Sequence, residues 1–200
     1  MSRRLRLSCT PRGGERGAAL VEIALVLPLF VVLFVGAVQF GTAWLTKLQV
    51  EGGARAGARV GSSLSSTRLA DYSLLRGVAA SLAKVGLDRV EHVVVYKAAG
   101  PDGRPPAGCT GSSPASQPGL CNVYSGGMLR TLDPAQFTGT TSCGSTAPDR
   151  QWCPVSRQSV LSRGPDFLGV WVKTSTASFT GVFGAAKKVT ATSVMRLEPR

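Results

Sequence analysis

The sequence predicts an α+β protein, in which a long N-terminal transmembrane helix precedes a second amphipathic helix and a small antiparallel sheet of three or four strands. An apolar run at 18–45 predicts the first helix, and apolar residues at helical spacing in 67–86 predict the second. Stretches rich in β-branched residues predict the strands, at 89–97, 167–178 and 188–197. A disulfide-stapled loop region completes the expected fold.

The first helix reads AALVEIALVLPLFVVLFVGAVQFGTAWL and exceeds the roughly 20 residues that span a bilayer. It contains one acid, Glu22, and one helix-breaking residue, Pro28. Basic residues gather before it, at Arg3, Arg4, Arg6, Arg12 and Arg16. By the positive-inside rule the N-terminus is cytoplasmic and the C-terminal part is extracytoplasmic, so we expect a single-pass protein of the inner (cytoplasmic) membrane.

Four segments follow from this topology. Residues 1–17 form a basic cytoplasmic leader, 18–45 the transmembrane helix, 46–66 a juxtamembrane extension and 67–200 an exported α+β domain. Gly, Pro, Ser and Thr dominate an insertion at about 100–165, which shows little apolar periodicity. We therefore expect this insertion to contribute little to the core.

Residues 48–63 are expected to continue the first helix beyond the bilayer, and glycines recur there every four residues, at Gly53, Gly57 and Gly61. Small residues on one face let helices approach closely. Two interpretations have equal weight: a helix-packing seam between subunits, or a helix loosened by its glycines.

The other elements follow from periodicity. Leu75, Val78 and Leu82 fall on one face of the second helix, which Gly86 would end. The later strands alternate, with Leu168, Val170 and Val172 on one face of the first, and Val189, Ala191, Ser193 and Met195 on one face of the last. His92, the sole histidine, is expected to be a surface strand residue.

Five cysteines are present, and Cys9 falls in the leader. An even number in the exported part predicts two disulfides in an oxidising compartment. Three pairings are possible. We favour Cys109–Cys121 with Cys143–Cys153, because short loops close at the least entropic cost. A zinc site would be expected to show a C-x2-C pair, which the sequence lacks.

The composition argues against several functions. The net charge is +12, but the basic residues outside the leader are scattered, so nucleic acid is not expected as a partner. The acids outside the membrane are isolated, no nucleophile–base–acid set can be assembled and no phosphate-binding G-x-x-x-x-G-K-[ST] loop exists. We expect no enzymatic activity, no cofactor and no bound metal.

A processing motif stands at the start of the apolar run. Gly17 ends the basic leader, Ala18 follows it, and Glu22 is fifth in the segment after the glycine. This arrangement resembles the type IV prepilin and pseudopilin site, where a membrane peptidase cuts after the glycine. In that family the acid is thought to neutralise the new N-terminal amine of a neighbouring subunit, and paired charges in a membrane cost less than single ones.

The wider N-terminal segment, about residues 16–63, resembles the TadE-like family, which comprises pseudopilin-like proteins of tight-adherence (Flp, type IVc) pilus systems. Leader charge, Gly17, Glu22, Pro28 and the later small-residue and arginine stretch occur in order. The resemblance implies a minor pseudopilin of a pilus-assembly or secretion apparatus. Its partners would be other pilins or pseudopilins, pilus-assembly membrane proteins, a prepilin peptidase and the bilayer.

Other outcomes stay open. Ile23 stands where processed members usually carry an aromatic residue, so the leader could be retained. A signal peptidase could instead cut after Ala37, giving a start at Val38. The alternative function is a bitopic envelope protein whose disulfide-stapled exported domain is a binding module.

Overall fold

A computed structural model describes residues 13–137, 142–176 and 187–199. The long helices are α1 (Gly13–Leu64) and α2 (Ala70–Leu82), and the strands are β1 (Val90–Ala98), β2 (Cys121–Ser125), β3 (Phe167–Ser175) and β4 (Lys188–Arg196). Short helices are α3 (Ala107–Thr110) and α4 (Gly126–Arg130), with 3-10 turns at Leu87–Arg89, Pro134–Gln136, Pro154–Ser156 and Leu161–Arg163. These elements confirm the predicted α+β class.

The chain divides into two compact units, Met1–Thr42 and Ala43–Arg200. In the first unit, α1 exposes its large apolar side chains; Leu25, for example, is 75% exposed. Within Gly17–Leu64 this helix is long and apolar enough to cross a membrane, by length and composition. The helix also continues through the predicted extension and ends at Leu64.

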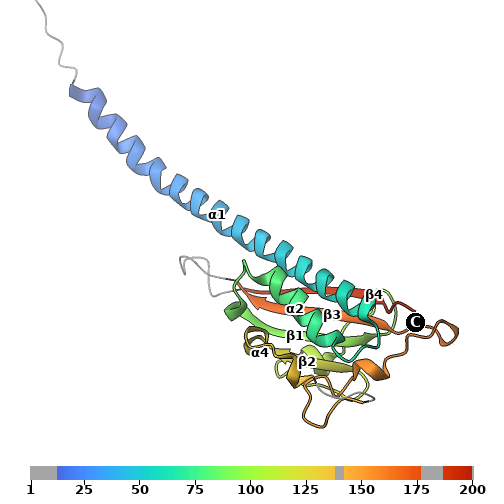
Figure 1. Ribbon diagram of the computed structural model, residues 1–200. Helices are drawn as coiled ribbons and strands as arrows, with labels where there is room; N and C mark the ends of the chain where they lie inside the picture. The colour runs from blue at the N-terminus through green and yellow to red at the C-terminus, as the bar shows by residue number, and fades with distance from the viewer. Residues whose placement is uncertain (1–12, 138–141, 177–186, 200) are drawn as a thin grey trace, which may run out of the picture. The chain divides into compact units, whose positions relative to one another are not determined.

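In the second unit, four antiparallel strands form a sheet in the order β2-β1-β3-β4 (Figure 1). The central strand β1 buries Val93, Val94, Val95 and Tyr96 in succession, because both faces of the sheet are covered there. Strands β1, β3 and β4 were predicted, whereas β2 was not. It lies inside the insertion at about 100–165.

One face of the sheet packs against α2 and the C-terminal part of α1. Leu168, Val170 and Val172 of β3 join this core, as predicted, with Ala191 of β4. Helix α2 spans Ala70–Leu82, which is shorter at both ends than the predicted 67–86. Gly86, with a φ of 96°, ends the turn that follows, and its N–H donates to the carbonyl of Leu82 at 3.2 Å. This layer is the larger of two apolar cores.

The glycines of α1 lie within this layer, which is a place that neither of the two interpretations named. Gly53, Gly57 and Gly61 are buried against the chain's own α2 and β3. A Cβ built on Gly57 would lie 2.5 Å from Cγ2 of Val78, and one on Gly61 would lie 2.6 Å from Cδ1 of Leu74. The close approach that the seam interpretation required is present, but the partner helix belongs to the same chain.

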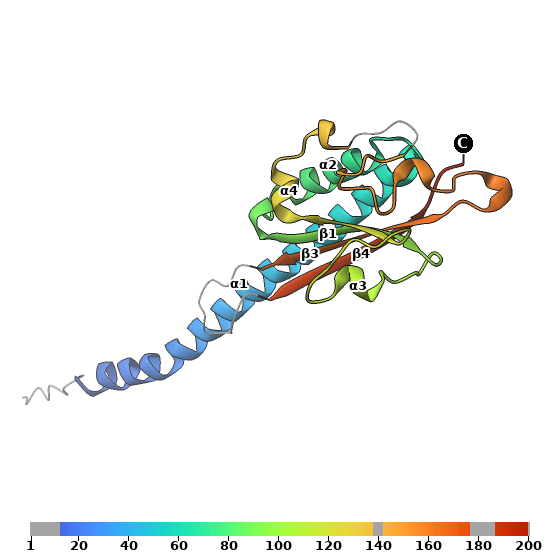
Figure 2. The ribbon, with the colours of Figure 1, turned by 90° about the horizontal axis from the view of Figure 1, so that it is seen from below.

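The opposite face carries a smaller core beside α3, which lies across the sheet from α2 (Figure 2). Tyr96 and Trp171 pack there, and the Tyr96 hydroxyl donates to the carbonyl of Gly103 at 2.8 Å. A side chain at Gly169 would overlap the Tyr96 ring. Cys109 and Cys121 are bonded and buried in the same core.

The expectation that the insertion contributes little to the core is wrong. Tyr124, Leu129, Phe137 and Trp152 are all buried in the larger core. These residues come one at a time from turns, short helices and a five-residue strand. The described elements of this region are too short to show a helix or strand period, although their apolar residues are large.

Candidate functional site

The proposed processing site lies near the start of α1. Gly17 and Ala18 are exposed, and no atom lies within 4 Å of a Cβ built on Gly17. Both residues are helical in the structure. Among the described residues of this unit, none therefore covers the peptide bond between them.

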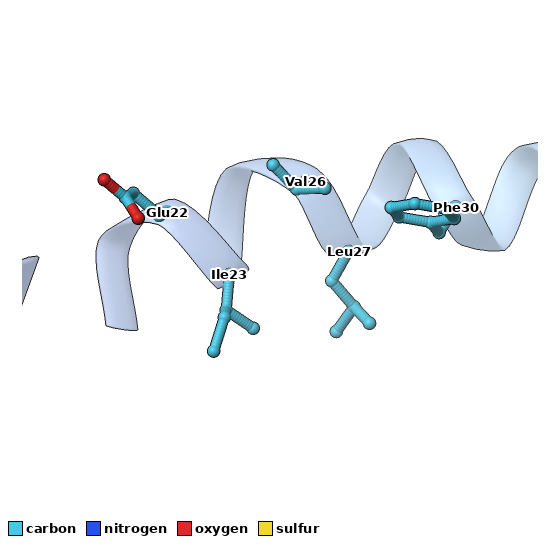
Figure 3. Close-up of a pocket in the computed structure, with 5 residues that line it drawn as sticks. All are labelled: Glu22, Ile23, Val26, Leu27 and Phe30. Carbon is cyan, nitrogen blue, oxygen red and sulfur yellow. The ribbon is translucent and has the colours of Figure 1, made fainter. Parts of the chain in front are cut away.

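Glu22 lies at one end of an apolar strip on the same helix. It lines a shallow, open pocket of about 330 Å³ with Ile23, Val26, Leu27 and Phe30 (Figure 3). These five residues share a face because they are spaced at roughly one and two helical turns. Among the side chains that the structure describes, none pairs with the Glu22 carboxylate. The strip thus combines apolar surface with a single negative charge.

Pro28 lies inside α1, six residues after Glu22. Its ring removes one backbone N–H from the helical ladder and crowds the preceding turn. It lies between Leu27 and Leu29, which are both exposed. The exposed apolar surface therefore surrounds both residues that the sequence predicted to act in assembly.

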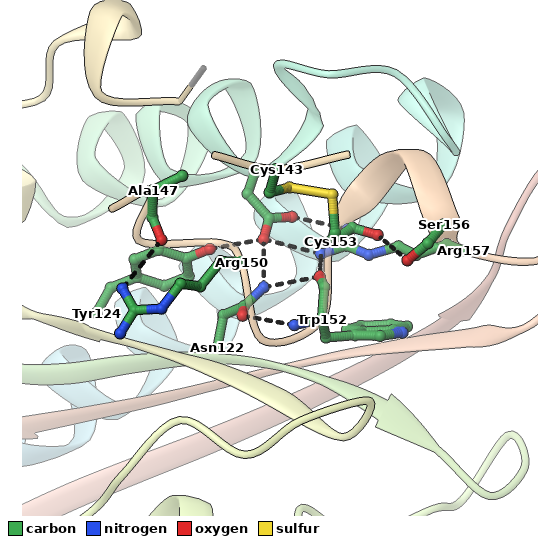
Figure 4. The surroundings of a disulfide bond; sticks show 10 residues. Asn122, Tyr124, Cys143, Ala147, Arg150, Trp152, Cys153, Ser156 and Arg157 are labelled. Atoms are coloured by element: carbon green, nitrogen blue, oxygen red, sulfur yellow. Dashed lines mark hydrogen bonds and ion pairs between the residues drawn. A yellow bond between two sulfur atoms is a disulfide. The ribbon is translucent and has the colours of Figure 1, made fainter. Parts of the chain in front are cut away.

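The second unit contains a buried polar cluster that the sequence analysis missed. Asp71 of α2 and Arg157 form an ion pair of 2.7 Å between Oδ1 and Nη1, and both side chains are fully buried (Figure 4). Oδ2 of Asp71 accepts from Arg157 at 2.8 Å, from the Tyr124 hydroxyl at 2.6 Å and from Asn122 at 3.1 Å. The acids that follow the apolar helix are therefore not all isolated, which corrects that prediction.

The loop around Trp152 completes this cluster. The Trp152 carbonyl accepts from Asn122 at 2.9 Å and from Arg157 at 3.0 Å, and the Trp152 N–H donates to Oδ1 of Asn122 at 2.9 Å. The Arg157 guanidinium also lies 4.1 Å from the centre of the Trp152 ring. The disulfide Cys143–Cys153 closes the same loop. Both disulfides thus join the cysteines that loop length favoured.

Burial sets the protonation of the neighbouring groups. It raises the pKa of the Tyr124 hydroxyl, and the Asp71 charge adds to this effect, so the phenol keeps the proton that it donates. Asp149 is also buried, and loss of hydration followed by repulsion from Asp71 raises its pKa to about 6. One sequence signal could have indicated this cluster, since Asp71 continues the apolar stripe of Leu74, Leu75 and Val78.

The cluster ties α2, β2 and the Cys143–Cys153 loop together. Most of its groups donate to or accept from one another, which is how buried polar side chains stabilise a core. Nε of Arg157 and Oδ1 of Asp149 are buried without a hydrogen-bond partner among the described residues. Within the described residues, no group of three His, Cys, Asp or Glu side chains could hold a metal ion. His92 is half-buried on β1, so its predicted place on the surface is only partly right.

The described residues define a chain with one membrane-competent helix followed by a disulfide-bonded α+β domain. Residues 17–59 match the model of the family described as TadE-like protein, which confirms the predicted resemblance. The match includes Gly17, Ala18, Glu22, Pro28 and two of the three seam glycines. Searches of curated proteins and of solved structures found no match.

Proposed function

We propose that this protein is a membrane-anchored, minor pseudopilin-like component of a tight-adherence pilus-assembly or secretion apparatus. The TadE-like segment suggests involvement in such a system. The observation that carries the finer proposal is the Glu22 strip, where one carboxylate and an exposed apolar face occur on a membrane-competent helix. Helix α1 would then pack among other helices in the bilayer as well as anchor the chain.

The physical argument concerns the cost of a charge in lipid. An acid within an apolar helix is costly unless it reaches the headgroups or meets an opposite charge. A neighbouring subunit's new α-amine, exposed by a cut between Gly17 and Ala18, would supply such a charge near the same depth. Glu22 would therefore set the register of α1 against its neighbour.

The test of this role is Glu22→Ala, with Glu51→Ala as the matched control on the same helix. Among the described side chains, Glu51 pairs with Arg55, at 3.8 Å on the surface, and such pairs contribute little to stability. We expect Glu22→Ala to insert into the membrane normally and to be lost from the assembled apparatus, measured by co-purification from the native host. Normal assembly of the Glu22→Ala protein would reject the proposed role.

Trimming is tested separately by N-terminal sequencing of the membrane-purified protein. A start at Ala18 is the expected result. An intact Met1 would show that the leader is retained, and a start at Val38 would assign the cut to a signal peptidase. Either of these results removes the amine-pairing step.

A second candidate is a bitopic envelope protein whose exported domain is a binding module. The observation that favours it is the extent of the family match, because almost all of the sheet domain lies beyond residue 59. On this hypothesis the helix is only an anchor. Glu22→Ala would then leave the biological activity intact.

A further inference from the structure

Strand β4 forms one edge of the sheet over nine residues. Its inner side pairs with β3 from Lys188 opposite Ser175 to Arg196 opposite Phe167. In the described part of the chain, no strand pairs with its outer side. Long, open strand edges are templates for pairing with another extended chain.

Two hydrogen bonds show which backbone groups of β4 point outward. The N–H of Thr176 donates to the carbonyl of Lys187 at 2.8 Å, and the N–H of Leu197 donates to the carbonyl of Asp166 at 2.9 Å. Both pairs keep the β3–β4 register, in which hydrogen-bonded and non-hydrogen-bonded pairs alternate. The residues whose N–H and C=O groups point away from β3 are therefore Lys188, Thr190, Thr192, Val194 and Arg196.

The opposite edge of the sheet, which β2 forms, differs because its outward backbone groups already have hydrogen-bond partners. The outward N–H of Val123 in β2 donates to Oγ of Ser116 at 2.8 Å. Cys121 and Gln117 exchange backbone hydrogen bonds of 3.0 and 3.1 Å. Residues before β2 thus use the backbone groups that an incoming strand would need. Only β4 offers a continuous row among the described strands.

Charge distinguishes between the possible occupants of this edge. The strand carries Lys188 near one end and Arg196 at the other, both exposed, and no acid. Glu91 lies 3.6 Å from Lys188 but is shared with Lys173, at 3.0 Å, and Lys187 adds another exposed cation. Beyond Arg196, the exposed Glu198 offsets part of the charge. Both terminal cations, Lys188 and Arg196, are nevertheless exposed. The outward row ends after Arg196, because the N–H of Glu198 donates to the carbonyl of Ser62 in α1 at 3.0 Å.

A second copy of β4 fits this edge poorly. Antiparallel pairing centred on Thr192 would place Lys188 opposite the partner copy's arginine at both ends, and like charges directly opposite destabilise a sheet. A parallel arrangement would place like ends together. Shifts of the register between the two copies that avoid these contacts leave fewer residues paired. The centre, with Thr190, Thr192 and Val194, favours β pairing.

We propose that the outer edge of β4 is a docking site for an extended segment of another protein, with acidic residues at both ends and β-forming residues between them. The backbone row of β4 supplies affinity, and the terminal cations supply selectivity for the acidic ends. This site lies in the exported domain and does not depend on the role proposed for Glu22.

The test uses the disulfide-bonded full chain in lipid nanodiscs and fluorescence anisotropy with labelled nine-residue peptides. The probe alternates Thr and Val and carries Glu at both ends. One matched peptide carries Lys at both ends, and another is the Glu peptide methylated on alternate backbone amides. We expect saturable binding of the Glu peptide, with binding of both matched peptides weakened by about tenfold or more.

Two variants at one position isolate the backbone contribution. Thr192→Pro removes an outward N–H without breaking a β3–β4 hydrogen bond, since edge strands tolerate proline at such positions. We expect it to weaken binding of the Glu peptide about tenfold, whereas Thr192→Val should bind like the wild type. If Thr192→Pro fails to fold, Lys188→Glu with Arg196→Glu replaces it and should reverse the preference between the Glu and Lys peptides.

Several results would overturn the proposal: no saturable binding of the Glu peptide, equal binding of the Glu and Lys peptides, or unchanged binding by the folded Thr192→Pro protein. A wild-type dimer that Thr192→Pro dissociates would assign the edge to a second copy instead. The Glu22→Ala protein should bind the Glu peptide normally, which separates this test from that of the proposed function.

Discussion

Gly57 provides a sharp test of the packing of α1 against the other elements of the second unit, Ala43–Arg200. A methyl group added there would lie 2.5 Å from Cγ2 of Val78, 3.4 Å from Leu74 and 3.5 Å from Val170. Carbon atoms normally approach to about 3.5–4.0 Å, so the Val78 methyl must move by about 1 Å. Gly57→Ala therefore forces α1 and α2 apart or displaces Val78.

The magnitude follows from a comparison with Gly52, which lies on the exposed face of the same helix. No atom lies within 4 Å of a Cβ built on Gly52. Both substitutions replace glycine by alanine in a helix, which favours the folded state by about 0.5–1 kcal/mol. Because this gain is common to both, their difference isolates overpacking. We expect Gly57→Ala to be less stable than Gly52→Ala by about 1–3 kcal/mol.

The assay is urea unfolding of the full chain in nanodiscs, followed by tryptophan fluorescence. Gly61→Ala should resemble Gly57→Ala, because its added Cβ would lie 2.6 Å from Leu74. Gly53→Ala should fall between Gly57 and Gly52, with its nearest contact at 3.2 Å from Leu82. Equal stability of the Gly57 and Gly52 variants would refute the intrachain seam. If Gly57→Ala or Gly61→Ala prevented assembly of the apparatus without changing the free energy of unfolding, the glycines would belong to an interface between subunits.

Two further predictions concern the buried polar cluster. Arg157→Met should destabilise the domain by about 3–5 kcal/mol in urea unfolding, because it leaves the Asp71 carboxylate buried without its cation; a loss below about 1 kcal/mol would contradict this account. Asp149 has a pKa raised from 3.8 to about 6, so the folded state binds the proton more tightly. The free energy of unfolding of the wild type, relative to that of Asp149→Asn, should therefore fall by up to about 1.4 kcal/mol per pH unit as the pH rises from 3.8 to about 6. A relative stability that rises with pH over this range would contradict the account.

The parts of the fold that the sequence predicted are those with a sustained period. Strands β3 and β4 alternate over nine residues, and the helical stripe of α2 includes Leu75, Val78 and Leu82. The disulfide pairing also agreed with an argument from loop length. In each case the deciding information is local, so that a short stretch of sequence contains it.

The features that the sequence did not predict depend on distant contacts. Strand β2 has five residues and follows from its pairing with β1. Asp71 and Arg157 are 86 residues apart, and nothing near either residue in the chain indicates the other. The spacing of Gly53, Gly57 and Gly61 predicts a flat helix face, but spacing cannot tell which helix covers it. The assembly roles of Glu22 and Pro28 stay predictions, which the sequence could offer because their motif is contiguous.

The central claim is that residues 18–45 act in assembly as well as anchoring. The most direct measurement replaces them with a polyleucine helix that keeps Gly17 and the basic leader, and compares recovery of the apparatus by co-purification from the native host. A second replacement restores only Glu22 and its apolar strip. The account predicts loss of assembly in the first protein, at normal membrane insertion, and partial recovery in the second. Full assembly with the plain polyleucine helix would contradict it.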